Sequence, residues 1–335
     1  MNEASSLPIV ILSTADFDAS VWTNKQHIAS RLAAEIDVHY IESLGLRAPR
    51  LRWQDMRRIL RRVFKLNANG RPRSGKSRWQ MKMDRLKIHA PNVLPWHGVP
   101  LARMVNRHLV HTKLIEALPP RYILWTFSPI TYGLEERAEK LVYHSVDLLH
   151  TIPGVPSSTL LAEERQLVAK SDEVIASSKG VADHLVQQGA QPLLWENVAD
   201  ISLFQRSRSD QRERRAIFIG NLTHTKVDFA VLEQIASRGI KLAVAGPTNI
   251  DGSQTDEALS RLLRIPTVEF LGNLSQEEMA AELGRSWVGI IPYHVNDYTA
   301  GVFPMKAYEY LGAGLHVVSS PLPSLGASPV AGVEI

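Results

Sequence analysis

Cysteine is absent from the chain, so it has no disulfide bond, no thiolate metal site and no cysteine nucleophile. No apolar run approaches the length that is needed to span a bilayer. Residues 1–6 are polar and lack the basic region that precedes the apolar part of a signal peptide. The strand-like runs at residues 8–12 and 216–220 are not followed by a G-x-G-x-x-G pattern, which disfavours a nicotinamide-dependent reductase. These absences favour a cytoplasmic protein.

Charge is unevenly distributed, although the net charge is only +4. From Arg47 to Lys87 the chain carries fifteen Lys and Arg residues against two Asp residues. The remainder of the chain is therefore net negative, and the basic character is concentrated in one segment. We expect the partner of that segment to be anionic.

Short apolar runs alternate with helical patterns along the chain. Runs typical of buried parallel strands lie at residues 8–12, 38–41, 122–125, 140–144, 173–176, 216–220, 241–246, 268–272, 288–292 and 316–319. Helical spacing is clearest over residues 157–170, 227–237, 276–283 and 305–311. This alternation predicts parallel sheets with right-handed crossovers.

Two such series are separated by a charged stretch without an apolar stripe at residues 206–215. A chain of 335 residues also exceeds what one hydrophobic core usually serves. We therefore predict two Rossmann-like, doubly wound α/β domains, at residues 1–205 and 216–335, with residues 206–215 as the linker. Ligands of such sheets bind beyond the carboxyl ends of the strands, so residues that directly follow strands are the candidates for a site.

The most informative stretch follows the strand at residues 288–292. A polar loop that includes Tyr293 leads to Pro304 at the start of a helix, where its missing N–H is no loss. Lys306 and Glu309 are one turn apart on one face of that helix. An ammonium group suits a diphosphate, and a carboxylate can accept two hydrogen bonds from a ribose diol. The alternative interpretation of these two residues is an exposed i,i+3 pair of little energetic value.

The segment FPMKAYEYLGAGLHVVSSPLPS (303–324) resembles the nucleotide-sugar binding segment of GT-B glycosyltransferases. The resemblance is closest to bacterial polysaccharide-assembly enzymes of the teichuronic-acid and xanthan glucuronosyltransferase type. Further blocks in matching order and spacing lie at residues 15–18, 24–27, 142–147, 163–164, 175–180 and 217–222. The resemblance therefore extends across the chain.

The resemblance implies a role for each matching residue. On the donor side, Lys306 would contact phosphate, Glu309 would bind ribose, Met305 would pack near the nucleotide, and Gly220 and Asn221 would lie close to the diphosphate. Tyr293 is placed in the same donor-binding group.

On the acceptor side, Asp147 would be the general base in an inverting displacement, with His144 as its competitor. The alternative for Asp147 is a turn or N-cap residue. Asp18 and His27 are weaker candidates for acceptor contacts, since a polar loop residue is usually only solvated.

One position departs from the pattern of the wider fold. Many retaining members carry a Glu-x7-Glu motif, and its first Glu would fall on Gly301. The departure weakens a retaining assignment and leaves the stereochemistry open. We expect no metal, because no Asp-x-Asp pattern occurs in a donor loop, and no cofactor, since the nucleotide-sugar is a substrate. GT-B proteins normally continue with further helices, so we expect the C-terminal domain to be incomplete at Ile335.

Part of the basic segment has the pattern of an amphipathic helix. Apolar residues that include Trp53 and Phe64 recur at helical spacing, among the cationic residues Arg57, Arg58, Arg61 and Arg62. Such a helix suits the headgroup layer of an anionic membrane, where a lipid-linked acceptor would be presented. Nucleic-acid binding is the rival interpretation, and we disfavour it because no known nucleic-acid module accompanies the charge. A core helix with a solvated basic face is the third possibility.

Taken together, the sequence predicts a glycosyltransferase, hexosyl or glucuronosyl, that is metal-independent and uses a nucleotide-sugar, with UDP-sugar favoured. The predicted acceptor is a lipid-linked saccharide in cell-surface polysaccharide biosynthesis. The predicted location is peripheral, on the inner face of the plasma membrane. The alternative is a non-catalytic nucleotide-sugar or saccharide binding protein with the same fold.

Overall fold

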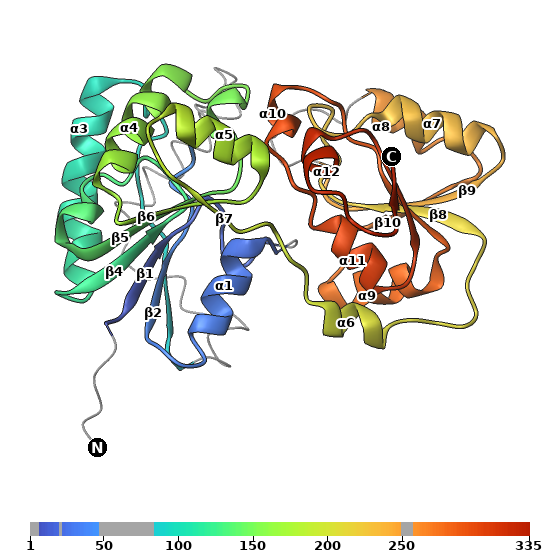
Figure 1. The fold of residues 1–335 in the computed structure, drawn as a ribbon, viewed down its shortest axis with the longest axis horizontal. Coiled ribbons are helices and arrows are strands. Elements are labelled where there is room, and N and C mark those ends of the chain that lie inside the picture. The colour runs from blue at the N-terminus through green and yellow to red at the C-terminus, as the bar shows by residue number, and fades with distance from the viewer. Residues whose placement is uncertain (1–6, 20–21, 47–83, 249–256) are drawn as a thin grey trace, which may run out of the picture. The chain divides into compact units, whose positions relative to one another are not determined.

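In a computed structural model, residues 7–19, 22–46, 84–248 and 257–335 are described. The chain divides into two compact units (Figure 1). The first unit comprises residues 1–176 and 182–194, and the second comprises residues 177–181 and 195–335. The division thus falls ahead of the predicted linker at residues 206–215. Among the described residues, no helix combines the length and the apolar character that crossing a membrane requires.

The first unit is built on a seven-stranded parallel sheet with the order β3-β2-β1-β4-β5-β6-β7. Its strands are β1 (Ile9–Leu12), β2 (Val38–Ile41), β3 (Leu86–His89), β4 (Tyr122–Thr126), β5 (Ala138–Ser145), β6 (Glu173–Ala176) and β7 (Leu193–Leu194). Its principal helices are α1 (Asn24–Leu32), α3 (Pro100–Leu109), α4 (Ser157–Lys170) and α5 (Lys179–Gln187). Figure 1 shows α4 and α5 on one face of this sheet and α1 on the other.

Short turns of helix connect several of these elements. They are the π-helix η1 (Val110–Leu114) and the 3-10 turns η2 (Ile115–Ala117), η3 (Leu134–Arg137) and η4 (Leu149–Thr151). The central strands β1 and β2 are buried along their whole length, as parallel strands covered on both faces must be.

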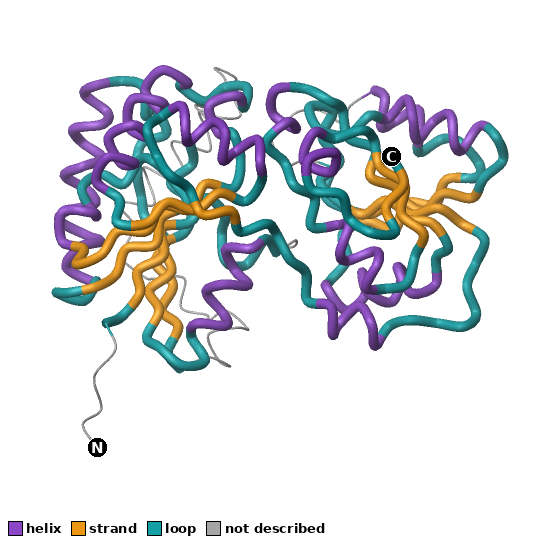
Figure 2. The backbone as a smooth tube through the Cα atoms, in the orientation of Figure 1, coloured by secondary structure: helices purple, strands orange, loops and turns teal. Residues whose placement is uncertain are grey.

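The second unit contains a six-stranded parallel sheet with the order β10-β9-β8-β11-β12-β13. Its strands are β8 (Arg215–Ile219), β9 (Lys241–Ala245), β10 (Val268–Gly272), β11 (Val288–Ile291), β12 (His316–Ser319) and β13 (Val333–Glu334). Its helices are α6 (Ile201–Arg206), α7 (Phe229–Ser237), α8 (Glu257–Leu262), α9 (Gln276–Arg285), α10 (Asp297–Ala300), α11 (Lys306–Gly312) and α12 (Pro323–Ala327). In Figure 2, α7 and α8 lie on one face of the sheet, and α9 and α11 lie on the other.

Both sheets have the doubly wound order that the alternating sequence predicts. In each sheet the first strand along the chain lies in the interior, and later strands are added on both sides of it. In the second unit, β8 lies between β9 and β11. The carboxyl ends of these three strands therefore meet at one edge of the sheet, and the next residues along the chain are the candidates for a site.

Candidate functional site

Two glycines let the chain turn closely at the ends of β8 and β9. Gly246 has a φ of +131°, and a Cβ there would lie 2.0 Å from the carbonyl oxygen of Gly220. The Gly220 N–H donates to the Ala245 carbonyl at 2.9 Å. The two turns thus pack backbone against backbone, and a side chain at Gly246 would separate them.

Lys306 lies directly over this turn. A Cβ added to Gly220 would come within 2.7 Å of Lys306 Cε and 3.2 Å of its Nζ. Burial alone would lower the pKa of Lys306, but Tyr293 and Glu309 outweigh it and raise the pKa, in part through a side-chain hydrogen bond with Tyr293. The ammonium group therefore stays charged above a glycine turn, and its contact with phosphate stays a prediction.

Glu309 lies on the same face of α11 and is also only partly exposed. Burial raises the pKa of its carboxyl group, and Lys306 opposes that rise. In the described part of the chain the two side chains form no ion pair within 4.0 Å, so they are not the exposed salt bridge of the alternative interpretation. A partly buried carboxylate next to a lysine, with its hydrogen-bonding capacity unused by that lysine, can accept hydrogen bonds from a diol.

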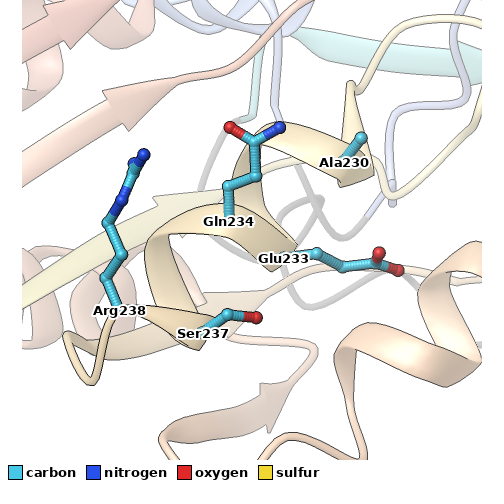
Figure 3. A pocket seen from close by; sticks show the side chains of 5 residues that line it. All are labelled: Ala230, Glu233, Gln234, Ser237 and Arg238. Atoms are coloured by element: carbon cyan, nitrogen blue, oxygen red, sulfur yellow. The ribbon is translucent and has the colours of Figure 1, made fainter.

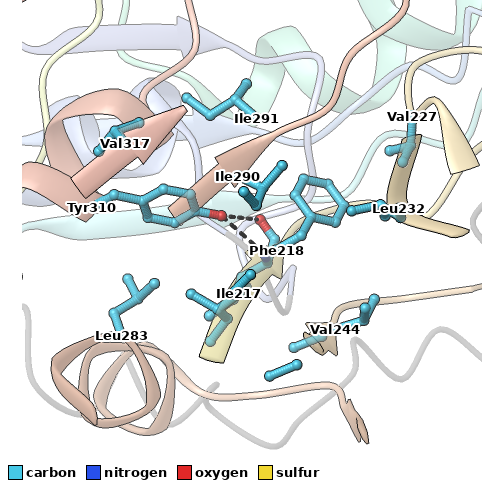
Figure 4. Packing of buried hydrophobic residues seen from close by; sticks show 14 of the residues in the cluster. Ile217, Phe218, Val227, Leu232, Val244, Leu283, Ile290, Ile291, Tyr310 and Val317 are labelled. Atoms are coloured by element: carbon cyan, nitrogen blue, oxygen red, sulfur yellow. Dashed lines mark hydrogen bonds between the residues drawn. The ribbon is translucent and has the colours of Figure 1, made fainter. Parts of the chain in front are cut away.

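The position of α11 is fixed by Tyr310, whose ring is fully buried. Its hydroxyl accepts a hydrogen bond from the Ile219 N–H at 3.0 Å, and Figure 4 shows this group among the packed side chains of β8 and β11. A Cβ at Gly289 would lie 2.2 Å from the Tyr310 ring, so the ring needs a glycine on β11. Tyr310, which directly follows Glu309, therefore anchors Lys306 and Glu309 to the end of β8.

The loop before α11 is held by hydrogen bonds from side chains to its backbone carbonyl groups. The Gly301 carbonyl accepts from Ser178 Oγ at 2.8 Å, and the Val302 carbonyl accepts from Ser324 Oγ at 2.6 Å. The Phe303 carbonyl accepts from Asn197 Nδ2 at 3.0 Å. Gly301 itself has φ −89° and ψ −4°, which any residue adopts, so its backbone conformation does not require glycine.

Two arginines of residues 206–215 secure the other end of α11. Arg208 Nε donates to the Gly312 carbonyl at 2.9 Å, and Arg212 Nη2 donates to the Ala313 carbonyl at 3.2 Å. Arginines at a helix C-terminus satisfy carbonyls that have no partner inside the helix. The charged segment that the sequence identifies only as a linker thus helps to position the candidate site.

Lys226 is a second cation at the site, and the sequence analysis missed it. Its Nζ lies 4.7 Å from the centroid of the Tyr293 ring and 5.8 Å from that of Tyr298. Tyr293, which is 4% exposed, therefore has one lysine over its ring and another at its hydroxyl. Asn221 is exposed and Met305 is partly exposed at the N-cap of α11. No local motif links Lys226 to Lys306, because β8 and α11 are brought together only by the fold.

Asp147 belongs to the first unit and lies two residues beyond the end of β5. It is partly exposed, and its carbonyl accepts from the Leu149 N–H at 2.9 Å. The N-cap of the adjacent turn η4 is Leu148, and no side chain caps that turn. The N-cap alternative therefore receives no support, whereas the hydrogen bond from Leu149 agrees with the alternative of a turn residue. Among the described residues, none forms a hydrogen bond or ion pair with the Asp147 carboxylate, and its role as a base stays a prediction.

His144 is buried at the end of β5, with ring centroids 4.9 Å from Phe127 and 6.1 Å from Trp125. Burial, with a contribution from Lys25, lowers the pKa of His144 to about 3. An imidazole with such weak basicity is a poor proton acceptor at neutral pH, which disfavours His144 as a general base. Lys25, itself 5% exposed, was not among the predicted residues.

The remaining predicted residues are those of the acceptor side and of the basic segment. Asp18 is exposed, and His27 packs on α1 against Trp22 with ring centroids 5.3 Å apart. The proposed membrane residues Trp53, Arg57, Arg58, Arg61, Arg62 and Phe64 lie outside the described residues.

A surface hollow of about 410 Å³ lies along α7 and is lined by residues such as Glu233 and Arg238 (Figure 3). It contains none of the predicted site residues, and its lining comes from one exposed helix.

Comparison with known proteins gives matches in sequence and in fold. Residues 213–333 match the model of the family described as glycosyl transferases group 1. The chain is also 30% identical over 209 residues to TuaH of Bacillus subtilis strain 168, to which a role as a teichuronic acid biosynthesis glycosyltransferase is ascribed. That match covers 56% of this chain and 51% of TuaH, so the chain spans about half the length of this curated relative.

Solved structures resemble the whole chain. A sucrose-phosphate synthase from Thermosynechococcus elongatus superimposes with a TM-score of 0.67 at 14% identity, covering 97% of this chain and 84% of that one. A glycosyltransferase from Rickettsia africae does so with a TM-score of 0.58 at 11% identity, covering 97% and 82%. Identities this low carry information on fold alone. They confirm the predicted α/β architecture of two Rossmann-like domains, the GT-B fold.

Proposed function

We propose that the chain transfers a sugar from a nucleotide-diphosphate-sugar to a saccharide acceptor, which the match of residues 213–333 to the model of group 1 glycosyl transferases supports. The observation that carries the proposal is the placement of Lys306 over the Gly220 turn, with Glu309 beside it on the same helix. One cation and one carboxylate at the carboxyl edge of a parallel sheet suit the two polar parts of a nucleotide diphosphate.

The donor is held through its diphosphate and its ribose. Lys306 and Lys226, which both contact Tyr293, supply positive charge to the diphosphate, and Glu309 accepts hydrogen bonds from the ribose hydroxyls. As the sugar departs, negative charge develops on the leaving diphosphate, and the two ammonium groups stabilise it without a metal ion. A uridine diphosphate sugar is the proposed donor, with a hexosyl or glucuronosyl group.

Asp147 is the proposed general base. Its carboxylate takes the proton of an acceptor hydroxyl while that oxygen attacks the anomeric carbon and the nucleotide diphosphate leaves. This role belongs to an inverting displacement, and it fits a chain with Gly301 in place of a carboxylate. Asp18 and His27 are proposed to contact the acceptor from the same unit.

The acceptor is proposed to be a lipid-linked saccharide of cell-surface polysaccharide biosynthesis, at the inner face of the plasma membrane. The role ascribed to TuaH supports this class of acceptor. The basic segment from Arg47 to Lys87 supports attraction to an anionic membrane surface.

Two substitutions test the proposal with two separate readouts. Lys306→Ala is expected to abolish the thermal stabilisation that UDP gives to the wild type, which amounts to about 2.7 kcal/mol at a hundred times the Kd. Asp147→Asn is expected to keep that stabilisation and to lose transfer from the UDP-sugar. If the wild-type protein binds UDP but shows no transfer from the UDP-sugar, the chain is a non-catalytic binding protein. Stabilisation by none of the nucleotide diphosphates tested would refute the donor site itself.

A further inference from the structure

A cluster of two histidines and one glutamate lies in the first unit, and the proposed transfer reaction does not use it. His150 lies on η4, Glu164 on α4 and His184 on α5. One ligand atom from each of the three residues lies within 4.8 Å of the other two. Glu164 is buried, and the two histidines are partly buried. We call these residues the His-Glu-His cluster.

The carboxylate of Glu164 is oriented by a buried hydroxyl. Tyr143 Oη donates to Glu164 Oε1 at 2.5 Å, which leaves Oε2 facing His184 Nε2 at 2.6 Å. The rings of His150 and His184 are stacked, with centroids 4.5 Å apart and planes 27° apart. The three donor atoms therefore come from three separate elements and lie within 4.8 Å of one another.

The chemistry of this donor set is that of a transition-metal site. Two imidazole nitrogens and a carboxylate oxygen form a set that zinc binds with bond lengths of about 2.0–2.2 Å and with a fourth position left to water. Bonds of that length in a tetrahedral site place the donor atoms roughly 3.4 Å apart. Here Glu164 Oε2 and His184 Nε2 are 2.6 Å apart, and all three donor atoms lie within 4.8 Å of one another, which is the range that such a site occupies. Tyr143 would act as the outer partner that orients a ligating carboxylate.

We propose that His150, Glu164 and His184 bind a divalent transition-metal ion with the ligand preferences of Zn²⁺. The ion joins η4 to α4 and α5, and water completes its coordination. His150 is three residues beyond Asp147, and the Leu149 N–H donates to the Asp147 carbonyl within the same turn. The ion thus fixes the turn that carries Asp147. The importance of that turn rests on the proposed function, whereas the metal site itself is independent of it.

Cobalt titration of the full chain tests the site directly. The protein is prepared without a polyhistidine tag and treated with a chelator, and Co²⁺ is added while visible absorption is followed. We expect a saturable band of low-symmetry Co²⁺ at one equivalent, which Zn²⁺ abolishes. His150→Asn and His184→Gln should remove the band, and Tyr143→Phe should weaken binding about 10–100-fold through loss of the outer hydrogen bond.

The matched control is His108→Gln, since His108 is an exposed histidine at the end of α3. It should leave the cobalt band unchanged. Far-ultraviolet circular dichroism of each variant shows whether the fold is kept. A folded His150→Asn protein that binds Co²⁺ as tightly as the wild type, or a wild type without a saturable band, would overturn the site. The Tyr143-Glu164-His184 hydrogen bonds would then be only a structural network. No nucleotide is present in this titration, so its failure is distinct from failure of the donor site.

Discussion

Replacing Gly220 by alanine should move Lys306 without unfolding the second unit. The new Cβ would stand 2.7 Å from Lys306 Cε, whereas ordinary van der Waals contact begins near 3.4 Å. Because Cε belongs to the far end of a flexible side chain, the lysine can swing away. Gly220 is not in the left-handed region, so alanine fits its backbone.

The expected magnitude follows from what the displaced ammonium group does. A hydrogen bond to a charged group contributes about 1.5–3 kcal/mol. Its loss should weaken UDP binding roughly 10- to 150-fold, since about 1.4 kcal/mol corresponds to a factor of ten. The free energy of unfolding should change by less than about 1 kcal/mol, because loss of backbone freedom in the unfolded chain offsets the local crowding.

Calorimetric titration with UDP and urea unfolding of the same preparations measure both quantities. Gly326→Ala is the matched control, since a Cβ there meets nothing within 4 Å, and it should bind UDP like the wild type. Gly246→Ala is the contrasting case: its Cβ would meet the Gly220 carbonyl oxygen at 2.0 Å, so it should lose folding stability first. Unchanged UDP affinity in a folded Gly220→Ala protein would show that Lys306 does not contact the donor.

Three further substitutions test the roles of Tyr310, Glu309 and His144. Tyr310→Phe should cost about 1–3 kcal/mol in urea unfolding, because the buried Ile219 N–H loses its acceptor. Burial raises the pKa of Glu309, and hydrogen bonds from the ribose should lower that pKa when UDP binds, so binding should release a proton at acid pH. Glu309→Gln should reduce this proton release, which calorimetry in buffers of different ionisation enthalpy measures. His144→Phe should flatten the loss of stability on acidification: the folded pKa of about 3 lies below the unfolded 6.5, so the wild type loses up to about 1.4 kcal/mol per pH unit as pH falls through that window.

Regular elements with a clear periodicity were predictable from the sequence. The helix predicted at residues 157–170 is α4 (Ser157–Lys170), and the strand predicted at residues 316–319 is β12 (His316–Ser319). By contrast, β3 (Leu86–His89) was missed, because Lys87 and the preceding Arg85 give it the composition of the basic segment. It is an edge strand that pairs with β2 alone, so its apolar content is low.

Helix α3 escaped prediction for a different reason. Leu101 and Met104 are 66% and 65% exposed, while Asn106 is fully buried. The burial pattern of this helix thus runs against the hydrophobicity of its residues. Asn106 is held by hydrogen bonds to Leu94 and to the Tyr132 hydroxyl, which only tertiary structure supplies.

The candidate site was predictable only as far as local spacing reaches. Lys306 and Glu309 share a helix, so one turn of separation places them together. The contacts of Tyr293 with Lys226 and Lys306 join β11, the loop after β8 and α11, and no spacing rule reveals them. The His-Glu-His cluster likewise draws on three elements without a common motif. Sequence reasoning finds neighbours within an element, whereas the fold decides which elements meet.

The three tethered carbonyl groups before α11 bear on how this protein could diversify. Ser178, Ser324 and Asn197 hydrogen-bond to the backbone carbonyl groups of residues 301–303. The side chains of Val302 and Phe303 are buried in the core of the second unit, so the loop is held through its side chains as well. Descendants of this chain would therefore have to keep apolar residues at those two positions for the helix behind them to stay where it is.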